Sequence, residues 1–200
     1  MNMLVADMAA VISLWVFIVL MVGTPGPANL LMMTVGARFG VMAAMPFNLG
    51  LVLGKLGLNA AMAIGVGVVL SEQPSIVTAF KFISAGVMIY LSMRTLGFAD
   101  VSGGQAETCP GFLSGIIVHP LNPKAWVMTV LAWSEFGPQL GSITQQAIII
   151  CSSFAVSQLI LHGLWAVAGS LLSRALGQSL WLNRILVLLT CSVVLWAVLI

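Results

Sequence analysis

Long apolar segments with almost no charged side chains fill this chain, and this feature limits most strongly what it can fold into. Only 6% of the 200 residues are charged, and 60% are hydrophobic. An average soluble domain carries about 25% charged residues. This composition excludes a soluble globular enzyme, a disordered chain and a nucleic-acid-binding module, since the last needs a basic face to meet phosphate. The chain is therefore expected to lie in a lipid bilayer and to bind no nucleic acid.

The apolar segments are separated by short polar breaks and are long enough for membrane-spanning helices. A span needs roughly 20 apolar residues, so six spans use about 120 residues plus connections. The length fits one transmembrane domain over residues 1–200, with no room for a second. We predict an all-α polytopic membrane protein with six transmembrane helices. They are expected over residues 8–35, 41–70, 75–98, 111–133, 143–172 and 180–200, and residues 99–110 form the only long loop.

The arginines predict how the chain is oriented in the membrane. Arg38, Arg94, Arg174 and Arg184 lie in or beside the connections that follow the odd-numbered segments, whereas Lys81 lies on the other side. Cytoplasmic loops of membrane proteins carry an excess of Lys and Arg. Both termini are therefore expected in the periplasm.

An internal repeat is also expected, because many transporters contain one. A shift of 96 residues aligns Pro27 with Pro123, and a shift of 103 residues aligns Lys55 with Gln158. Each half, about residues 1–98 and 110–200, would cross the membrane an odd number of times. The halves would then form a 3+3 inverted repeat with breaks in helices 1 and 4.

The first break lies in the segment Gly23–Asn29, which holds two prolines and two glycines. Proline removes a backbone donor and frees a carbonyl one turn earlier, and in hydrocarbon such groups need another partner. The resumed helix would present free amides and a positive dipole end that suit a carboxylate, while the freed carbonyls suit an ammonium group. A packing kink is the alternative interpretation. The candidate substrate-binding residues here are Pro25, Gly26, Pro27, Ala28 and Asn29.

The second break lies in His119–Trp126 and repeats this arrangement. Asn122 is placed to cap the resumed helix at Pro123, since Asn is a preferred N-cap residue. Lys124 follows inside an otherwise apolar segment, where an uncompensated ammonium is costly, so it should face a cavity or a partner. Asn122, Pro123 and Lys124 are therefore candidate substrate-binding residues. The alternative for Lys124 is a bracing role, in which it binds carbonyls freed by the break.

Polar side chains on two further segments could line a pathway. Asn48, Lys55 and Asn59 share one helical face, and Gln158 and His162 follow each other by one turn. A buried Lys or His can carry a proton, so Lys55 and His162 are our candidate coupling residues. The alternative for each is a hydrogen bond or ion pair between helices.

The remaining reactive residues predict no metal site, no cofactor and no catalytic site. The three cysteines have no metal-like spacing and form no disulfide framework. Ser157 and His162 are the nearest nucleophile and base, but they lack the glycine frame of a hydrolase. The chain is therefore not expected to be an enzyme.

Two motifs resemble those of a known family. TPGPANLL in the first segment and HPLNPKAW in the fourth are similar to signatures of the lysine-exporter (LysE/RhtB) family. GLVLGKLGLNAAMAIGVG and KFISAGVMIYLSMR look like its second and third spans.

The resemblance implies a secondary transporter of the bacterial inner membrane. Such a protein would export amino acids or close derivatives by proton antiport, with an amino acid and the lipid bilayer as partners, and could form a homo-oligomer. The alternatives are an exporter of another small solute, such as a metal cation, and a membrane scaffold without transport activity.

Overall fold

The regular elements of the computed structural model are helical throughout its described residues, which are 8–65, 74–94, 108–176 and 180–199. The prediction of an all-α protein is therefore confirmed. The helices are α1 (Met8–Gly23), α2 (Pro27–Phe39), α3 (Val41–Ala63), α5 (Pro74–Arg94), α6 (Phe112–Val118), α7 (Pro123–Leu131), α8 (Ile143–Ala175) and α9 (Leu180–Leu199). A π-helical turn, Ala132–Phe136, and a 3-10 turn, Gly137–Leu140, follow α7.

Among these helices, α3 and the segment Ile143–Leu176 are each long and apolar enough to cross a membrane. The pair α1 and α2, bent by 56°, would make a third span. The described residues thus hold two or three spans by length and composition, and the division into six spans stays a prediction. Most of the predicted loop at residues 99–110 lies outside the described residues.

Glycines with positive φ end two helices at positions that differ from the predicted ends. Gly40 (φ 86°) follows α2, which continues to Phe39 rather than stopping at residue 35. Gly65 (φ 88°) follows α3, which ends at Ala63, whereas the prediction extended it to residue 70. Residues 66–70 lie outside the described part.

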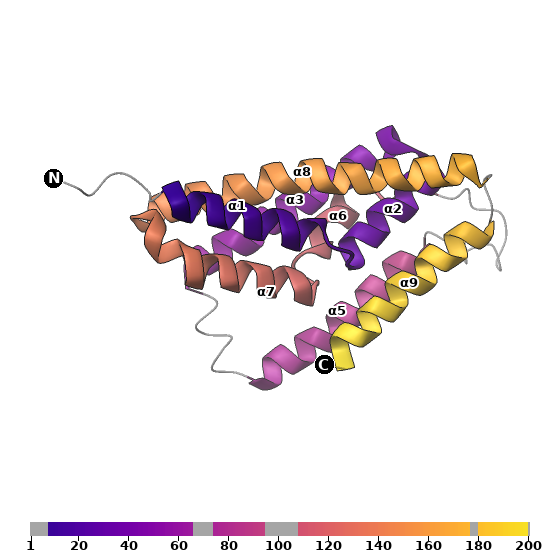
Figure 1. The fold of residues 1–200 in the computed structure, drawn as a ribbon. Coiled ribbons are helices and arrows are strands. Elements are labelled where there is room, and N and C mark those ends of the chain that lie inside the picture. Colours follow the sequence, from indigo (N-terminus) through magenta and orange to yellow (C-terminus); the bar gives the residue numbers. More distant parts are fainter. Residues whose placement is uncertain (1–7, 66–73, 95–107, 177–179, 200) are drawn as a thin grey trace.

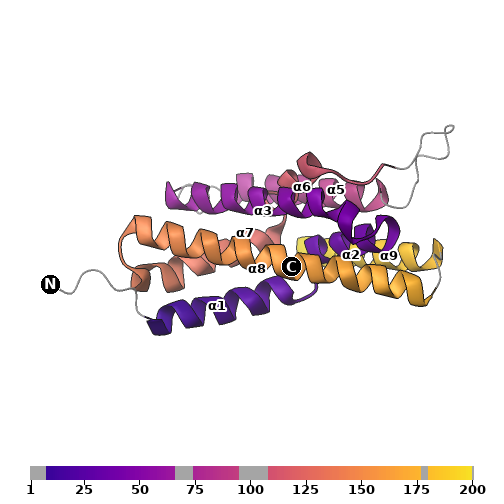
Figure 2. The same ribbon diagram turned by 90° about the horizontal axis from the view of Figure 1, so that it is seen from above.

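The long helix α8 organises the bundle and contacts α1, α2 and α3 (Figures 1 and 2). Small residues allow two of the closest crossings. Gly36 of α2 meets the backbone of α8 at Ala166, and Gly54 of α3 meets the backbone of α6 at Ile116. Such contacts are typical of helix association in membranes, where tight packing replaces the hydrophobic effect.

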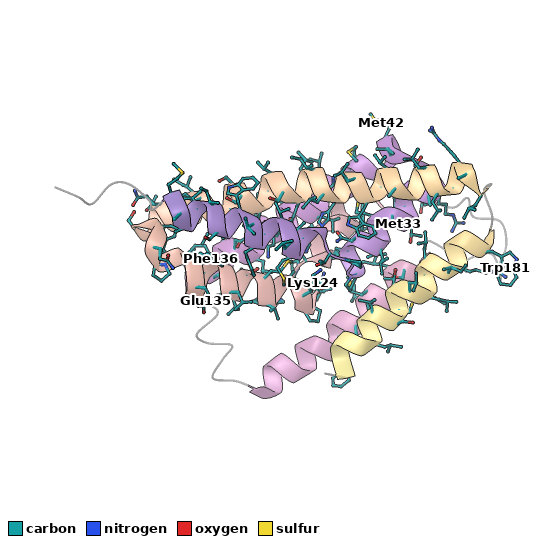
Figure 3. All side chains as sticks on the ribbon, viewed as in Figure 1. Met33, Met42, Lys124, Glu135, Phe136 and Trp181 are labelled. Carbon is teal, nitrogen blue, oxygen red and sulfur yellow. The ribbon has the colours of Figure 1, made fainter. Side chains whose placement is uncertain are left out.

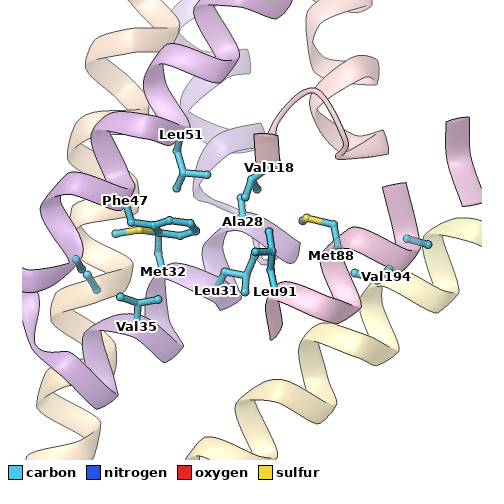
Figure 4. Close-up of a cluster of buried hydrophobic side chains, with 13 residues drawn as sticks. Ala28, Leu31, Met32, Val35, Phe47, Leu51, Met88, Leu91, Val118 and Val194 are labelled. Atoms are coloured by element: carbon cyan, nitrogen blue, oxygen red, sulfur yellow. The ribbon is translucent and has the colours of Figure 1, made fainter. Parts of the chain in front are cut away.

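A buried apolar cluster joins α2 to α3, α5 and α9 (Figure 4). The helices α5 and α9 run side by side and reach the bundle through α2. This cluster fixes α2 on the side away from α1. Its largest members are Leu31, Met32, Val35, Phe47, Leu51, Met88, Leu91, Val118 and Val194.

Candidate functional site

At the break between α1 and α2, Thr24 and Pro25 are exposed whereas Gly26 and Pro27 are buried, and carbonyls of the break bind donors of the protein. Trp165 of α8 donates its Nε1–H to the Gly23 carbonyl at 3.2 Å. The Asn29 amide Nδ2 donates to the carbonyls of Val22 and Thr24, both at 2.7 Å. The sharp bend left by the two prolines is therefore held by side chains from both sides of the break and from α8.

Lys124 connects this break to the second one. Its Nζ donates to the Thr24 carbonyl and the Thr24 hydroxyl, both at 2.9 Å, and to the Pro25 carbonyl at 3.3 Å. Figure 3 shows Lys124, which is half-buried, at the start of α7, and Glu135 in the π-helical turn beyond the other end of that helix. The Lys124 ammonium thus binds carbonyls within the first break. The carbonyls freed by Pro25 and Pro27, those of Met21 and Gly23, accept instead from the Thr24 hydroxyl and from Trp165 Nε1.

The break between α6 and α7 is closed in the same manner. Asn122 is the N-cap of α7, and its side chain accepts from the Lys124 backbone amide at 3.1 Å. The backbone N–H of Asn122 donates to the His119 carbonyl at 3.0 Å, and Trp126 Nε1 donates to the Pro120 carbonyl at 2.7 Å. The predicted cap is therefore present, and the His119 carbonyl, which Pro123 frees, has a partner.

The two breaks meet α8 around a small cavity. Its volume open to water is about 10 Å³, which is room for about one water molecule. Of the predicted substrate-binding residues, five line it, whereas the three prolines shape the breaks. Gln158 and His162 of the predicted pathway also line it. The lining residues are Met21, Val22, Gly26, Ala28, Asn29, His119, Asn122, Lys124, Met128, Gln158 and His162.

Several polar atoms around this cavity have no hydrogen-bond partner among the described residues. They are Oδ1 of Asn29, both ring nitrogens of His119, both amide atoms of Gln158 and Nδ1 of His162. All four side chains are at most 3% exposed. Most buried polar atoms in proteins are hydrogen-bonded, so these atoms are typical of a site that binds a polar solute.

The start of α2 gives the cavity a positive end. Ala28 and Asn29 follow Pro27 in the first turn, where backbone amides have no acceptor within the helix. The N-cap, Gly26, has no side chain with which to bond them. The helix dipole and the nearby Lys124 ammonium both favour an anionic group here.

The polar stripe of α3 does not line the cavity. Lys55 is fully buried, and its Nζ donates to the Ala125 carbonyl at 3.0 Å and to the Thr129 hydroxyl. The ammonium also lies 3.9 Å from the centre of the Phe154 ring. Lys55 therefore joins α3 to α7 and α8, as its alternative interpretation predicts.

The two asparagines of the stripe also bind neighbouring helices. Asn48 Nδ2 donates to the Leu159 carbonyl at 3.1 Å, and Asn59 Oδ1 accepts from Trp133 Nε1 at 3.1 Å. These contacts place Asn48 and Asn59 between helices, outside the cavity lining.

The described residues can also be examined for a metal site and for a hydrolase-like pair of serine and histidine. They contain no group of three His, Cys, Asp or Glu side chains that could hold a metal ion. The Ser157 hydroxyl is buried without a hydrogen-bond partner in this part of the chain, so it does not bond to His162 as a hydrolase pair would.

Sequence reasoning missed some cavity residues. His119 was set aside as a coupling residue because it belongs to the second break, yet its ring stacks on that of His162, with centroids 5.4 Å apart and planes at 22°. Met21, Val22 and Met128 are ordinary apolar residues on apolar helices, and no sequence signal distinguishes them from lipid-facing neighbours.

Comparisons with known proteins agree with this architecture. The Bacillus subtilis (strain 168) protein described as "Uncharacterized membrane protein YrhP" is 28% identical over 148 residues, which cover 66% of this chain and 70% of that protein. The Pseudomonas aeruginosa protein described as "Uncharacterized membrane protein PA4757" is 26% identical over 131 residues, which cover 60% of this chain and 59% of that protein. No solved structure matches the chain.

The family model called "LysE type translocator" matches residues 16–200, a range that contains both helix breaks and every residue of the cavity. A translocator family implies membrane transport of a small solute, in agreement with the apolar helices described above. The chain is therefore a multi-pass membrane protein and belongs to the LysE type translocator family.

Proposed function

We propose that this protein is a secondary transporter that exports amino acids or close derivatives from the cytoplasm in exchange for protons. The observation that carries this proposal is the cavity at which both helix breaks meet, because its lining combines the first turn of α2 and the Lys124 ammonium with polar atoms that have no hydrogen-bond partner among the described residues. Discontinuous helices at the centre of a transporter are typical substrate sites. Under this proposal the protein lies in the bacterial inner membrane with both termini in the periplasm.

The positive end of the cavity would bind the carboxylate of the substrate. The amides of Ala28 and Asn29 open α2 at this end, and Lys124 stands beside Gly26. A carboxylate placed here would meet backbone donors, a helix dipole and an ammonium. To bind it directly, the Lys124 ammonium would release one of its bonds to Thr24 or Pro25.

The other end of the cavity would bind the ammonium of the substrate. Asn29 Oδ1, Gln158 Oε1 and a lone pair of each histidine can accept hydrogen bonds there. An amino acid carries both an ammonium and a carboxylate, so it would satisfy both ends. The Lys124 ammonium makes the same cavity unfavourable for a metal cation.

An amino acid is larger than one water molecule, so it could enter only when the helices around the cavity separate. The pairing of helices supports such a movement between two similar halves. The α1–α2 pair packs on α8, the α6–α7 pair packs on α3, α3 packs on α8, and α5 packs on α9. Exchanging residues 1–98 with residues 110–200 maps these four pairings onto one another, as a six-span 3+3 inverted repeat would require. The contact of α2 with α9 has no counterpart of similar extent between α7 and α5 among the described residues.

A counterflow screen in proteoliposomes tests this proposal. The purified protein is reconstituted, and uptake of each of the twenty amino acids is measured with the vesicle interior acidic and again without a pH gradient. We expect at least one amino acid to accumulate only when the gradient is imposed. Lys124→Met should abolish this uptake, whereas Ser157→Ala, which changes a buried side chain outside the cavity lining, should retain it. No response to any amino acid would contradict the proposal.

A further inference from the structure

The stacked pair His119 and His162 has three ring nitrogens without a hydrogen-bond partner among the described residues. The rings come from different helical segments, the C-cap of α6 and the middle of α8, and their exposed fractions are 1% and 2%. Both nitrogens of His119 and Nδ1 of His162 have no hydrogen-bond partner in the described ranges. A histidine with a purely structural role would be expected to form hydrogen bonds across helices. The unpartnered nitrogens of this pair are instead available to bind a ligand or a proton.

The charged and titratable groups around the pair come from three helices. Lys55 of α3 acts electrostatically on both rings, and Lys124 of α7 acts on His162. Cys151 lies on α8 and interacts with Lys55. The residues that α1 and α2 contribute to the cavity lining are uncharged. Positive charge therefore faces the pair from two sides, and a second positive charge within the pair would be unfavourable.

We propose that His119 and His162 form one site that holds either a proton or the ammonium group of the substrate, but not both. This inference rests on the proposed function and assigns its coupling step. A neutral imidazole has one nitrogen lone pair. In the proton-loaded state that lone pair forms an N–H bond, and the ring becomes a cation with no acceptor. In the substrate-loaded state the lone pair accepts an N–H of the ammonium.

The exchange balances in protons and moves one net positive charge across the membrane in each turnover. When the substrate ammonium arrives, the protonated ring releases its proton to water through the opened side of the carrier, and the ammonium keeps its own three protons. When the substrate leaves on the other side, a proton from that side takes its place. Each turnover thus exchanges one zwitterion for one proton, because like charges exclude each other from the pair.

Lys55, our other candidate for proton coupling, fits this step less well. Its ammonium is hydrogen-bonded to α7, and Lys55 does not line the cavity, so a substrate would not meet it. The cavity places Asn29, Gln158 and both histidines around one space, where substrate and proton can compete directly.

Proton release on substrate binding tests the inference. The purified protein is titrated with the amino acid found by counterflow, by calorimetry in two buffers of different ionisation enthalpy, from about pH 8 down to the lowest pH at which the protein remains folded. We expect release that approaches one proton per substrate at the acid end. We also expect the affinity to fall about tenfold per pH unit there, as competition for one site requires.

Substitutions of the two histidines test whether the released proton comes from His119 and His162. His119→Gln and His162→Gln each replace one imidazole by an amide that keeps a carbonyl acceptor, so each single variant should release less than one proton per substrate. In the double variant neither imidazole remains, so binding should release no proton and its affinity should no longer depend on pH. Gln158→Met is the matched control on the same cavity, and it should bind more weakly while still releasing a proton.

Binding by the wild-type protein without proton release, or release that persists in the double variant, would overturn the inference and leave the proposed function standing. Failure of the wild-type protein to bind any amino acid would overturn both. If a histidine variant does not fold, as judged by gel filtration, the pH dependence of the wild-type protein and of Gln158→Met decides.

Discussion

The contact between α3 and α6 should depend on the lack of a side chain at Gly54. A Cβ added there would lie 3.0 Å from the carbonyl carbon of Ile116 and 3.2 Å from its Cα, and closer still to its carbonyl oxygen. Ordinary contacts between carbon atoms are about 3.5–4.0 Å. Gly54→Ala would therefore force the backbones of α3 and α6 apart, and backbone cannot rotate away as a side chain can.

Gly57, one turn further along the same helix, offers a matched control. A Cβ at Gly57 meets no other part of the described structure within 4 Å. Both substitutions gain about 1 kcal/mol in helix propensity, so this gain cancels when the two variants are compared. The difference is the cost of overpacking, about 1–3 kcal/mol, and we expect the upper end because the obstacle is backbone.

Thermal stability of the purified variants in detergent measures this difference. For a chain of this length, 1 kcal/mol shifts Tm by about 2–4 °C, so about 3 kcal/mol corresponds to a Tm for Gly54→Ala about 6–12 °C below that of Gly57→Ala. Gel filtration after heating gives each midpoint. Equal midpoints, or a lower midpoint for Gly57→Ala, would refute the close approach of α3 to α6.

Three further predictions follow from single contacts. Asn122→Ala removes the cap of α7 and should lower stability by about 0.5–2 kcal/mol; an unchanged midpoint would mean that the cap contributes nothing. Trp133→Phe leaves the buried Oδ1 of Asn59 without its donor and should cost about 1–3 kcal/mol, whereas Trp133→Phe combined with Asn59→Leu should recover part of this loss. Single cysteines placed in residues 99–107 of a cysteine-free variant should react with an impermeant thiol reagent only from the cytoplasmic side, and periplasmic reaction would invert the proposed orientation.

The sequence predicted the two breaks because proline acts on its own backbone. Pro25 and Pro27 end α1 and begin α2, and Pro123 begins α7, as local rules require. Asn122 as N-cap follows from the same kind of rule. These features depend on neighbours within a few residues, so no tertiary information was needed to find them.

Which side chains line the cavity depends instead on how whole helices are rotated and cross one another. Lys55 and Gln158 each lie on a polar face of an apolar helix, yet Gln158 lines the cavity and Lys55 binds the Ala125 carbonyl. Their positions differ because α3 and α8 present their polar faces to different neighbours. The stacking of His119 on His162 joins segments 43 residues apart (162 minus 119), which no local pattern could indicate.

Lys124 illustrates a choice that the sequence left open. Its residue type and place beside Pro123 fitted both a bracing role and a substrate contact. The bonds from its ammonium to Thr24 and Pro25 establish bracing in this closed arrangement. Contact with a substrate carboxylate remains part of the proposed function.

Binding of chemically altered substrates tests most directly whether the cavity between the two breaks recognises both charged groups of an amino acid. The amino acid found by counterflow is compared with its amide, which lacks the carboxylate, and with its N-acetyl derivative, which lacks the ammonium. A hydrogen bond to a charged group contributes about 1.5–3 kcal/mol, so we expect each derivative to bind about 10-fold to 100-fold more weakly than the parent in calorimetry. If either derivative binds as tightly as the amino acid, the corresponding end of the cavity does not recognise the substrate, and the central claim is wrong.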